Sequence, residues 1–429
     1  MAERPVRGGG VRLILTATLS SLQEDVKMWK LFKVAFLAAV VLAVFFGCGK
    51  KAKDTYLVGM AGPFTGDGAQ YGEMARMAAE MKADEINKAG GINGVALELE
   101  FQDDKGDPKE AANTAQKLGS NPRVLAVLGH FNSSCSLAGK EVYNSVGILQ
   151  MSYGSTNVTV CEGGDWTFRN VYRDDFQGQF IAEFMKYVLG YDRVAVFFDN
   201  DDYGRGLRDA FAERAEQVGL ELVREEAYVR DTQEYTPQLT QINAKKPDAI
   251  FISGLYANAA MILTQARNLG IETPFVGGDG LLSADLITNA ARAAEGVIVT
   301  CPFLPTTADE KTKKFVAEFK ERYGTEPDCW AALAYDAVGV VAEAVEKAGP
   351  DRKAIRNYVA AMDTPQKGYG GVAGLTYFNR DGDCMKPLVV AVVKDGKFVP
   401  YEKQAADLER AEEALAASAL PEAGPSEGS

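Results

Sequence analysis

From residue 55 onward, short apolar runs alternate with longer amphipathic stretches, and this alternation constrains the fold of the chain more than any other feature. Strands that are buried on both faces give continuous apolar runs, and the helices that cover them give amphipathic stretches. We therefore predict an α/β fold in which helices cover both faces of parallel sheets. The predicted strands are residues 56–60, 97–101, 124–128, 148–152, 194–198, 249–253 and 297–300, and the predicted helices are residues 71–86, 109–118, 176–188, 203–218, 236–242 and 258–269.

Two segments far apart in the chain are similar to each other. They are GDGAQYGEMARMAAEMKADEI (residues 66–86) and DNDDYGRGLRDAFAERAEQVG (residues 199–219). Each follows a predicted strand, places Tyr-Gly at a helix start and continues as an Ala-rich amphipathic helix. A repeat of this kind predicts two similar α/β lobes on one chain.

The C-terminal part of the chain has a different pattern. Alternating residues around Asp381-Gly382 and a turn at Asp395-Gly396 predict an antiparallel ribbon. Residues 402–429 become rich in Ala and Glu and end in PEAGPSEGS, which predicts a loose helix followed by disorder.

Residues 28–47 resemble the signal peptide of a bacterial lipoprotein. Lys30 and Lys33 lead into an apolar stretch at residues 34–46, which is short for a transmembrane helix. Cys48 follows, at the position where such a signal is cleaved and the thiol takes a diacylglycerol. An ordinary secretory signal or a short anchor is the alternative. Residues 1–27 are interpreted as an extension from a mis-assigned start codon, and residues 48–54 as a linker.

The composition excludes several classes of function. The net charge of −13 argues against nucleic acid as a partner. The one histidine, His130, leaves no basis for a His-rich metal site, and the cysteine spacings match no zinc pattern. We find no Gly-rich cofactor loop after the first strand, no P-loop and no nucleophile elbow. The sequence therefore predicts no enzyme, no cofactor and no metal.

Four loops at predicted strand ends carry small and polar residues: GPFTGDGAQY (62–71), VLGHFNSSCS (127–136), MSYGSTN (151–157) and FVGGDG (275–280). In open parallel sheets, ligands bind beyond the carboxyl ends of the strands. The second loop runs from a glycine into a Ser-rich helix start, which favours an anion. Asp279 in the fourth loop offers a carboxylate for a cation. Together these loops suit the carboxylate and the ammonium of an α-amino acid.

The segment from Gly62 to Leu118, together with DDYGRGL, ILTQARNLGIETPFVGGDG, EGVIVT and WAALAYDAV in the same order, resembles the branched-chain amino acid binding proteins. These are type I periplasmic binding proteins that serve ABC importers. The resemblance implies two Rossmann-like lobes joined by three hinge crossings, with the ligand in the cleft between them. It places the crossings near residues 173–174, 302–305 and 378–386. The implied lobe 1 is residues 55–173 and 304–378, and the implied lobe 2 is residues 174–303 and 379–401.

The same resemblance assigns roles to residues of the four loops. The position that matches Ser133 gives a hydroxyl and an N–H to the ligand carboxylate, and the position that matches Thr156 contacts both ends of the ligand. Gly154 matches a carbonyl that accepts from the ammonium, and Asp279 matches an acid opposite that ammonium. The other residues of the predicted ligand site are Tyr71, Phe131, Tyr153, Ser155, Tyr203 and Tyr256.

The cysteines depart from the family pattern. A family cysteine pair is replaced here by Asp104-Lys105 and Asn132. Cys135 lies near the start of the helix after the Ser-rich loop, and Cys161 lies just past the next ligand loop. Because export permits disulfides and both positions fall on the cleft rim of one lobe, we predict a Cys135–Cys161 disulfide.

Taken together, these features predict a protein of the bacterial cell envelope, lipid-anchored to the membrane and facing the periplasm or exterior. It would be a monomer that captures a free amino acid, branched-chain or otherwise aliphatic, and delivers it to the permease subunits of an ABC importer. Two alternatives stay open. One is the same fold tuned to an amide, urea or an aromatic acid, and the other is a ligand-sensing receptor domain.

Overall fold

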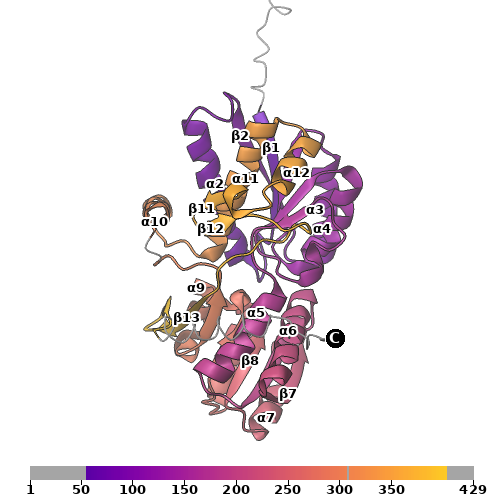
Figure 1. The fold of residues 1–429 in the computed structure, drawn as a ribbon. Helices are drawn as coiled ribbons and strands as arrows, with labels where there is room; N and C mark the ends of the chain where they lie inside the picture. The colour runs from indigo at the N-terminus through magenta and orange to yellow at the C-terminus, as the bar shows by residue number, and fades with distance from the viewer. Residues whose placement is uncertain (1–54, 307–308, 403–429) are drawn as a thin grey trace, which may run out of the picture. The chain divides into compact units, whose positions relative to one another are not determined.

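The computed structural model describes residues 55–306 and 309–402, and these residues form two lobes, each built on its own sheet (Figure 1). The predictions for the signal peptide, Cys48, the linker and the tail beyond residue 402 lie outside the described residues. Within the described part, no helix has the length and apolar character needed to cross a membrane.

Lobe 1 contains a five-stranded parallel sheet with the strand order β2-β1-β3-β4-β5. Its central strand β3 reads VLAVL, and every residue in it is buried because helices cover both faces. The elements of this part are β1 (Thr55–Gly62), α2 (Ala69–Lys88), β2 (Ala96–Asp103), α3 (Pro108–Ser120), β3 (Val124–Leu128), α4 (Ser133–Val146), β4 (Leu149–Ser152) and β5 (Thr167–Arg169).

Two helices from the C-terminal part of the chain return to lobe 1. α11 (Cys329–Ala348) packs against α2 and β3, and α12 (Arg352–Ala360) packs against β3 and β4. Figure 1 shows both helices, in orange, beside the indigo strands at the start of the chain. The described chain therefore returns to lobe 1 after it has contributed most, but not all, strands of the second sheet.

Lobe 2 contains a seven-stranded sheet with the strand order β14-β13-β10-β9-β8-β6-β7. The strands from β10 to β7 are parallel, and β13 and β14 add an antiparallel edge. The strands are β6 (Arg193–Asp199), β7 (Glu221–Tyr228), β8 (Ala249–Ser253), β9 (Phe275–Gly277), β10 (Ile298–Cys301), β13 (Val389–Lys394) and β14 (Lys397–Pro400). The helices are α5 (Asp174–Glu183), α6 (Asp202–Val218), α7 (Thr236–Ala244), α8 (Tyr256–Asn268) and α9 (Ala284–Ala290).

The predicted α/β class is confirmed, and each predicted strand and helix is present within a few residues of its expected bounds. The second turn of the predicted ribbon, at Asp395-Gly396, joins β13 to β14. The predicted strands on either side of the first turn, at Asp381-Gly382, do not form. One isolated bridge pair, Phe378 with Cys384, flanks this turn. A short hairpin that was not predicted, β11 (Tyr369–Gly371) with β12 (Gly374–Thr376), precedes it.

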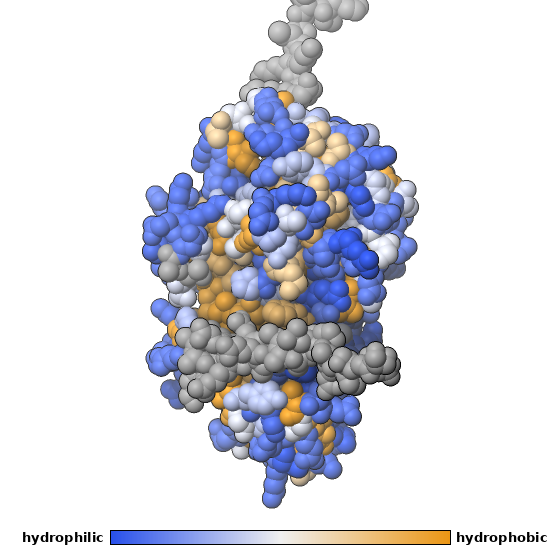
Figure 2. Space-filling model, in the orientation of Figure 1, coloured by the Kyte–Doolittle hydropathy of each residue, from blue (hydrophilic) through white to orange (hydrophobic). Residues whose placement is uncertain are grey.

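The surface agrees with this layering. Figure 2 shows hydrophilic residues over most of this face of both lobes, with hydrophobic residues gathered in the band between the lobes. In each lobe, loops follow the carboxyl ends of parallel strands, where ligands bind in sheets of this kind. Those loops carry the residues of the candidate site.

Candidate functional site

Two loops of lobe 1 meet beyond the ends of β3 and β4. α4 begins at Ser133, so the free backbone N–H groups of its first turn lie beside that serine. Ser133 is 2% exposed, and its hydroxyl accepts a hydrogen bond of 3.3 Å from the backbone N–H of Asn157. The two loops that were predicted to hold the ligand carboxylate are therefore in direct contact.

His130 fixes the shape of the first of these loops. Its Nδ1 lies 2.6 Å from Asp104 Oδ2 and its Nε2 lies 3.1 Å from the Tyr143 hydroxyl, all of them buried. The His130 carbonyl accepts hydrogen bonds from the hydroxyls of Ser152 at 2.7 Å and Ser155 at 3.3 Å. Because both ring nitrogens are engaged within lobe 1, this histidine acts as a structural residue.

Arg169 holds the second loop, which carries Thr156. Its side chain is fully buried, and Nη1 donates to the carbonyls on either side of that threonine, Ser155 at 3.1 Å and Asn157 at 2.8 Å. Its Nε lies 2.7 Å from Asp383 Oδ1, which forms a buried ion pair. A guanidinium with several donors in a fixed plane is suited to holding adjacent carbonyls in one orientation.

Asp279 approaches from lobe 2, where it follows β9 and is 1% exposed. Its Oδ1 accepts a hydrogen bond of 2.8 Å from the Tyr203 hydroxyl. Burial raises the pKa of Asp279 to about 6, although that hydrogen bond acts in the opposite direction. Its Oδ2, like the Thr156 hydroxyl, is buried without a hydrogen bond of good geometry to a described residue. Hydrogen bonding from Gln177 and Tyr172 also favours the ionised carboxylate, and a cationic group placed here would pair with Oδ2.

An aromatic cluster, formed by Tyr71, Phe131, Tyr256 and Trp330, occupies the space beside these anchors. Tyr71 stacks on Phe131 with ring centroids 4.4 Å apart, and Trp330 meets Phe131 edge-on at 4.8 Å. Tyr71 also meets Tyr256 of lobe 2 edge-on at 4.9 Å, and its hydroxyl donates to the Gly280 carbonyl of the same lobe. The cluster thus packs the two lobes against each other.

The cavity that remains between the anchors has a volume of about 10 Å³, close to the space of one water molecule. Its lining brings together five of the predicted ligand residues and four others. The predicted ones are Phe131, Ser133, Gly154, Tyr203 and Asp279, and the others are Asn132, Leu255, Gly280 and Trp330. Trp330 begins the segment WAALAYDAV, which is part of the family resemblance. Nothing in the sequence predicted that this residue lies beside the loops of lobe 1.

The remaining predicted residues lie around this cavity and do not line it. Tyr71 and Tyr256 adjoin it through the aromatic cluster, and Thr156 lies in the loop held by Arg169. The Ser155 hydroxyl donates to the Phe131 carbonyl at 2.8 Å, so it supports the loop. The ring of Tyr153 is buried beside Phe131, with centroids 6.1 Å apart.

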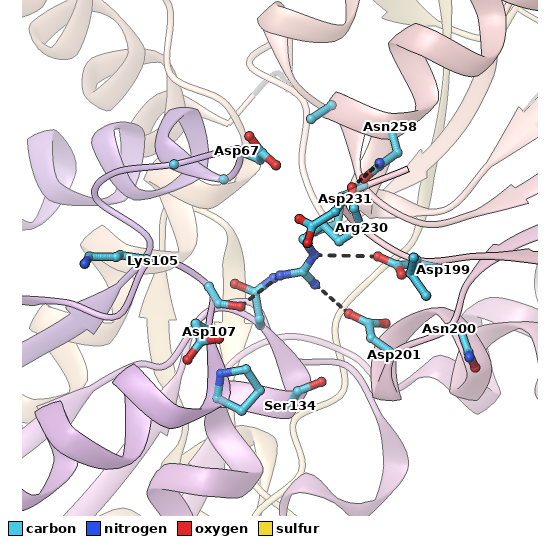
Figure 3. A pocket seen from close by; sticks show the side chains of 18 residues that line it. Asp67, Lys105, Asp107, Ser134, Asp199, Asn200, Asp201, Arg230, Asp231 and Asn258 are labelled. Atoms are coloured by element: carbon cyan, nitrogen blue, oxygen red, sulfur yellow. Dashed lines mark hydrogen bonds and ion pairs between the residues drawn. The ribbon is translucent and has the colours of Figure 1, made fainter. Parts of the chain in front are cut away.

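A larger hollow of about 440 Å³, which we call the mouth pocket, shares Asn132 and Leu255 with the small cavity (Figure 3). Lobe 1 contributes polar residues from the loops around Asp67, Lys105 and Ser134. Lobe 2 contributes the residues Asp199, Asn200, Asp201, Arg230, Asp231 and Asn258. Polar residues of both lobes therefore face each other across this pocket.

The predicted Cys135–Cys161 disulfide is wrong, because both cysteines are free and buried. The two thiols have different surroundings. The Cys161 thiol donates to the Gly382 carbonyl, with 3.6 Å between sulfur and oxygen, and burial raises its pKa to about 11. Burial also raises the pKa of the Cys135 thiol, whose charged neighbours are Asp104 and Arg230. Residues 55–306 and 309–402 contain no group of three or more His, Cys, Asp or Glu side chains that could hold a metal ion.

Comparison with known proteins finds one matching family and several similar proteins. The family described as "Periplasmic binding protein" matches residues 55–397. The "Amino acid binding protein" of Pseudomonas aeruginosa is 34% identical over 323 residues, which are 75% of this chain and 86% of that protein. The "Leucine-, isoleucine-, valine-, threonine-, and alanine-binding protein" of the same organism is 29% identical over 374 residues, which are 86% of this chain and 95% of that protein.

Solved structures agree with these relatives. The leucine binding protein LivK from Thermotoga maritima is 31% identical, with a TM-score of 0.76 over 81% of this chain and 98% of that one. The substrate binding protein LivJ from Streptococcus pneumoniae, solved with isoleucine, is 30% identical, with a TM-score of 0.76 over 80% of this chain and 97% of that one. The fold, the matched residues and these likenesses together show that the chain belongs to the periplasmic binding protein family, with the type I fold of LivK and LivJ.

Proposed function

We propose that this protein captures a free α-amino acid between its two lobes. The observation that carries this proposal is the pairing of two unlike anchors around one cavity. Ser133 lies at the N-terminus of α4 in lobe 1, where a carboxylate is stabilised. Asp279 in lobe 2 is buried, its Oδ2 makes no hydrogen bond of good geometry to a described residue, and an ammonium would pair with that oxygen. An α-amino acid carries both groups on one carbon.

The side chain of the ligand would lie against the aromatic cluster, which favours an apolar chain. The relatives' names support a branched-chain or other aliphatic amino acid, since they include leucine-, isoleucine- and valine-binding proteins. The names of LivJ, a transporter substrate binding protein, and of an ABC transporter substrate-binding protein from Desulfitobacterium hafniense support delivery to the permease subunits of an ABC importer. A lipid on Cys48 would keep the closed, loaded protein beside that permease at the membrane.

Capture requires the lobes to move. A cavity of about 10 Å³ does not admit an amino acid, so the lobes must part before the ligand enters. A ligand that contacts Ser133 in one lobe and Asp279 in the other stabilises the closed state by its differential interaction with that state. The hinge would be made by the crossings near residues 173–174, 302–305 and 378–386.

A related solute, such as an amide, urea or an aromatic acid, is the second candidate. Phe131 supports it, because its ring lies directly against Gly154: a Cβ built on Gly154 would lie 2.3 Å from Phe131 Cδ2. The resemblance matches Gly154 to a residue that contacts the ammonium, so the ring leaves less room for that group. Asp279 argues against it, because an uncharged amide would leave this buried carboxylate without a counter-charge.

A thermal-shift screen tests the proposal. Leucine, isoleucine, valine and alanine would be compared with propionamide, urea and benzoate. A ligand present at 100 times its dissociation constant adds about 2.7 kcal/mol to the free energy of unfolding. We expect stabilisation by one or more amino acids and a loss of that stabilisation in Asp279→Asn. Stabilisation by an amide that survives in Asp279→Asn would favour the second candidate.

A further inference from the structure

The mouth pocket is crossed by one side chain, Arg230. In Figure 3 its guanidinium lies in the middle of the pocket, with Asp199 and Asp201 on one side and the lobe 1 loop that contains Lys105 and Asp107 on the other. The side chain is 26% exposed, so it is largely removed from water although the pocket is open. Nothing in the proposed contacts with an amino acid uses this residue.

Arg230 is anchored in lobe 2, just beyond the end of β7. Its Nη2 donates to Asp201 Oδ2 at 2.7 Å, and its Nε lies 3.7 Å from Asp199 Oδ2. Its own carbonyl accepts a hydrogen bond of 2.8 Å from the Asn258 amide. Two carboxylates and one backbone bond therefore fix the direction in which the guanidinium points.

The free edge of the guanidinium reaches lobe 1, where Nη1 donates to the Gly106 carbonyl at 2.8 Å. Gly106 has a φ of +68°, and its N–H donates to Asp104 Oδ1 at 2.9 Å. Asp104 is the carboxylate paired with His130, so the acceptor belongs to the same framework as the candidate site. A Cβ on Gly106 would lie 3.3 Å from Arg230 Nη1, which means that the contact also depends on the absence of a side chain there.

Two other side chains that join the lobes near the site are neutral donors, whereas the charged pairs of Arg169 and Arg173 with Asp383 lie at the proposed crossings. The Asn157 amide donates to the Asp202 carbonyl at 2.6 Å, and Trp330 Nε1 donates to the Leu282 carbonyl at 3.1 Å. A hydrogen bond with a charged partner contributes more than a neutral one. Arg230 therefore adds a charge-assisted contact at the open side of the cleft, where closure must be held.

We propose that Arg230 is a latch between the lobes, a positioning residue that stabilises the closed state and thereby sets how readily the protein opens. The latch acts with or without a bound ligand, because the residues that it joins lie outside the anchor pair Ser133 and Asp279. Only its effect on the release of an amino acid rests on the proposed function.

Acrylamide quenching of Trp330 fluorescence tests the latch without any ligand. Trp330 is 1% exposed and bonds to lobe 2, so opening must expose it. Trp166→Phe removes another tryptophan of the described chain, and Trp29 lies in the predicted signal peptide, which cleavage would remove from every variant. In this background, Arg230→Gln is expected to lower the ratio of closed to open protein by about ten- to a hundredfold and so to increase the quenching of Trp330. Arg230→Lys keeps the charge but loses the planar fork, so its quenching is expected to lie between that of the parent protein and that of Arg230→Gln.

The matched control is Arg205→Gln, which removes the same charge from lobe 2. Among the described residues, Arg205 hydrogen-bonds to Asn200 and Asp202, both in its own lobe. Thermal unfolding of each variant shows whether it is folded. If folded Arg230→Gln and Arg230→Lys are quenched no more than Arg205→Gln, the latch is wrong.

Leucine dissociation measured by stopped flow separates the two proposals. We expect Arg230→Gln to release leucine faster and Asp279→Asn to lose binding. Increased quenching in Arg230→Gln without leucine binding by any variant would support the latch and contradict leucine as the ligand. Unchanged quenching together with Asp279-dependent binding would overturn the latch and leave the proposed function standing.

Discussion

Asp279 is a buried carboxyl group that the proposed ligand would contact. Burial raises its pKa from 3.8 to about 6 in the closed structure. Since the folded pKa lies above the unfolded one, the folded state favours the protonated form, and its stability falls by about 3 kcal/mol as the pH rises from below 4 to above 6. A ligand ammonium would reverse this, because it stabilises the ionised carboxylate.

The first prediction is therefore a pH dependence of binding. Affinity for an amino acid should be constant between about pH 7 and 8 and should fall by about tenfold per pH unit below pH 6, because Asp279 must lose its proton to pair with the ammonium. Calorimetry between pH 5 and 8 measures this. Asp279→Asn should bind weakly at every pH, and a wild-type affinity that does not change below pH 6 would remove Asp279 from the site.

The second prediction concerns Ser133, at the start of α4. Ser133→Ala should weaken amino acid binding by about ten- to a hundredfold, because it removes one hydrogen bond to a charged carboxylate. Ser145→Ala, an exposed position on the same helix, is the matched control. Equal affinities of the two variants in calorimetry would place the carboxylate elsewhere.

The sequence was informative about residues that follow strands and uninformative about those that arrive from elsewhere. Ser133, Gly154 and Asp279 line one cavity in the structure, and the sequence could single them out because each follows a strand of a parallel sheet. Trp330 and Leu255 were missed because their neighbours are set by packing between distant segments. The disulfide prediction failed for the same reason, since position along the chain does not tell which way each thiol faces.

At the scale of elements, the loop that carries Thr156 is connected to the last of the three proposed crossings. Arg169 holds that loop and pairs with Asp383, and Asp383 also pairs with Arg173 at 2.9 Å. Arg173 directly precedes α5, at another of the proposed crossings. One buried carboxylate, 4% exposed, thus connects a ligand loop with two segments that run between the sheets.

The third prediction follows from that network. Asp383→Asn should lower the free energy of unfolding by about 3–5 kcal/mol, because it leaves the Arg169 guanidinium buried without its counter-charge. Urea unfolding measures the change. Glu221→Gln is the control, since it breaks an exposed pair with Arg193 and should cost less than about 1 kcal/mol. Similar losses in both variants would show that the buried network contributes no more to the free energy of unfolding than an exposed ion pair does.

Elements with a clear pattern were predicted well, and elements without one were not. The strands β1, β3, β6 and β8 were recognised because each is a short apolar run bounded by polar residues. α11 was not assigned, although it has 20 residues, because it is buried on nearly every side and shows no amphipathic stripe. The π-helical turn at Phe184–Val188 was read as part of one continuous helix with α5.

At the scale of the whole molecule, a lipid on Cys48 would keep the protein beside its permease. The fourth prediction is that Cys48→Ser moves the protein from the membrane fraction to the soluble fraction, because the serine cannot take the diacylglycerol. Cys384→Ala, which removes a buried cysteine, should leave the distribution unchanged. A Cys48→Ser protein that keeps its membrane association with its signal cleaved would contradict a lipid anchor.

The last prediction concerns the order of opening and binding. In the closed structure the aromatic cluster bridges the lobes and the cavity is about 10 Å³, so opening must precede entry of the ligand. The observed rate of binding should therefore level off at the opening rate as the ligand concentration rises. Stopped-flow fluorescence of Trp166→Phe, followed through Trp330, measures this rate, and Trp330→Phe is the control that should lose most of the signal. A rate that rises linearly with concentration, without a plateau, would mean that the ligand meets a protein whose lobes are already apart.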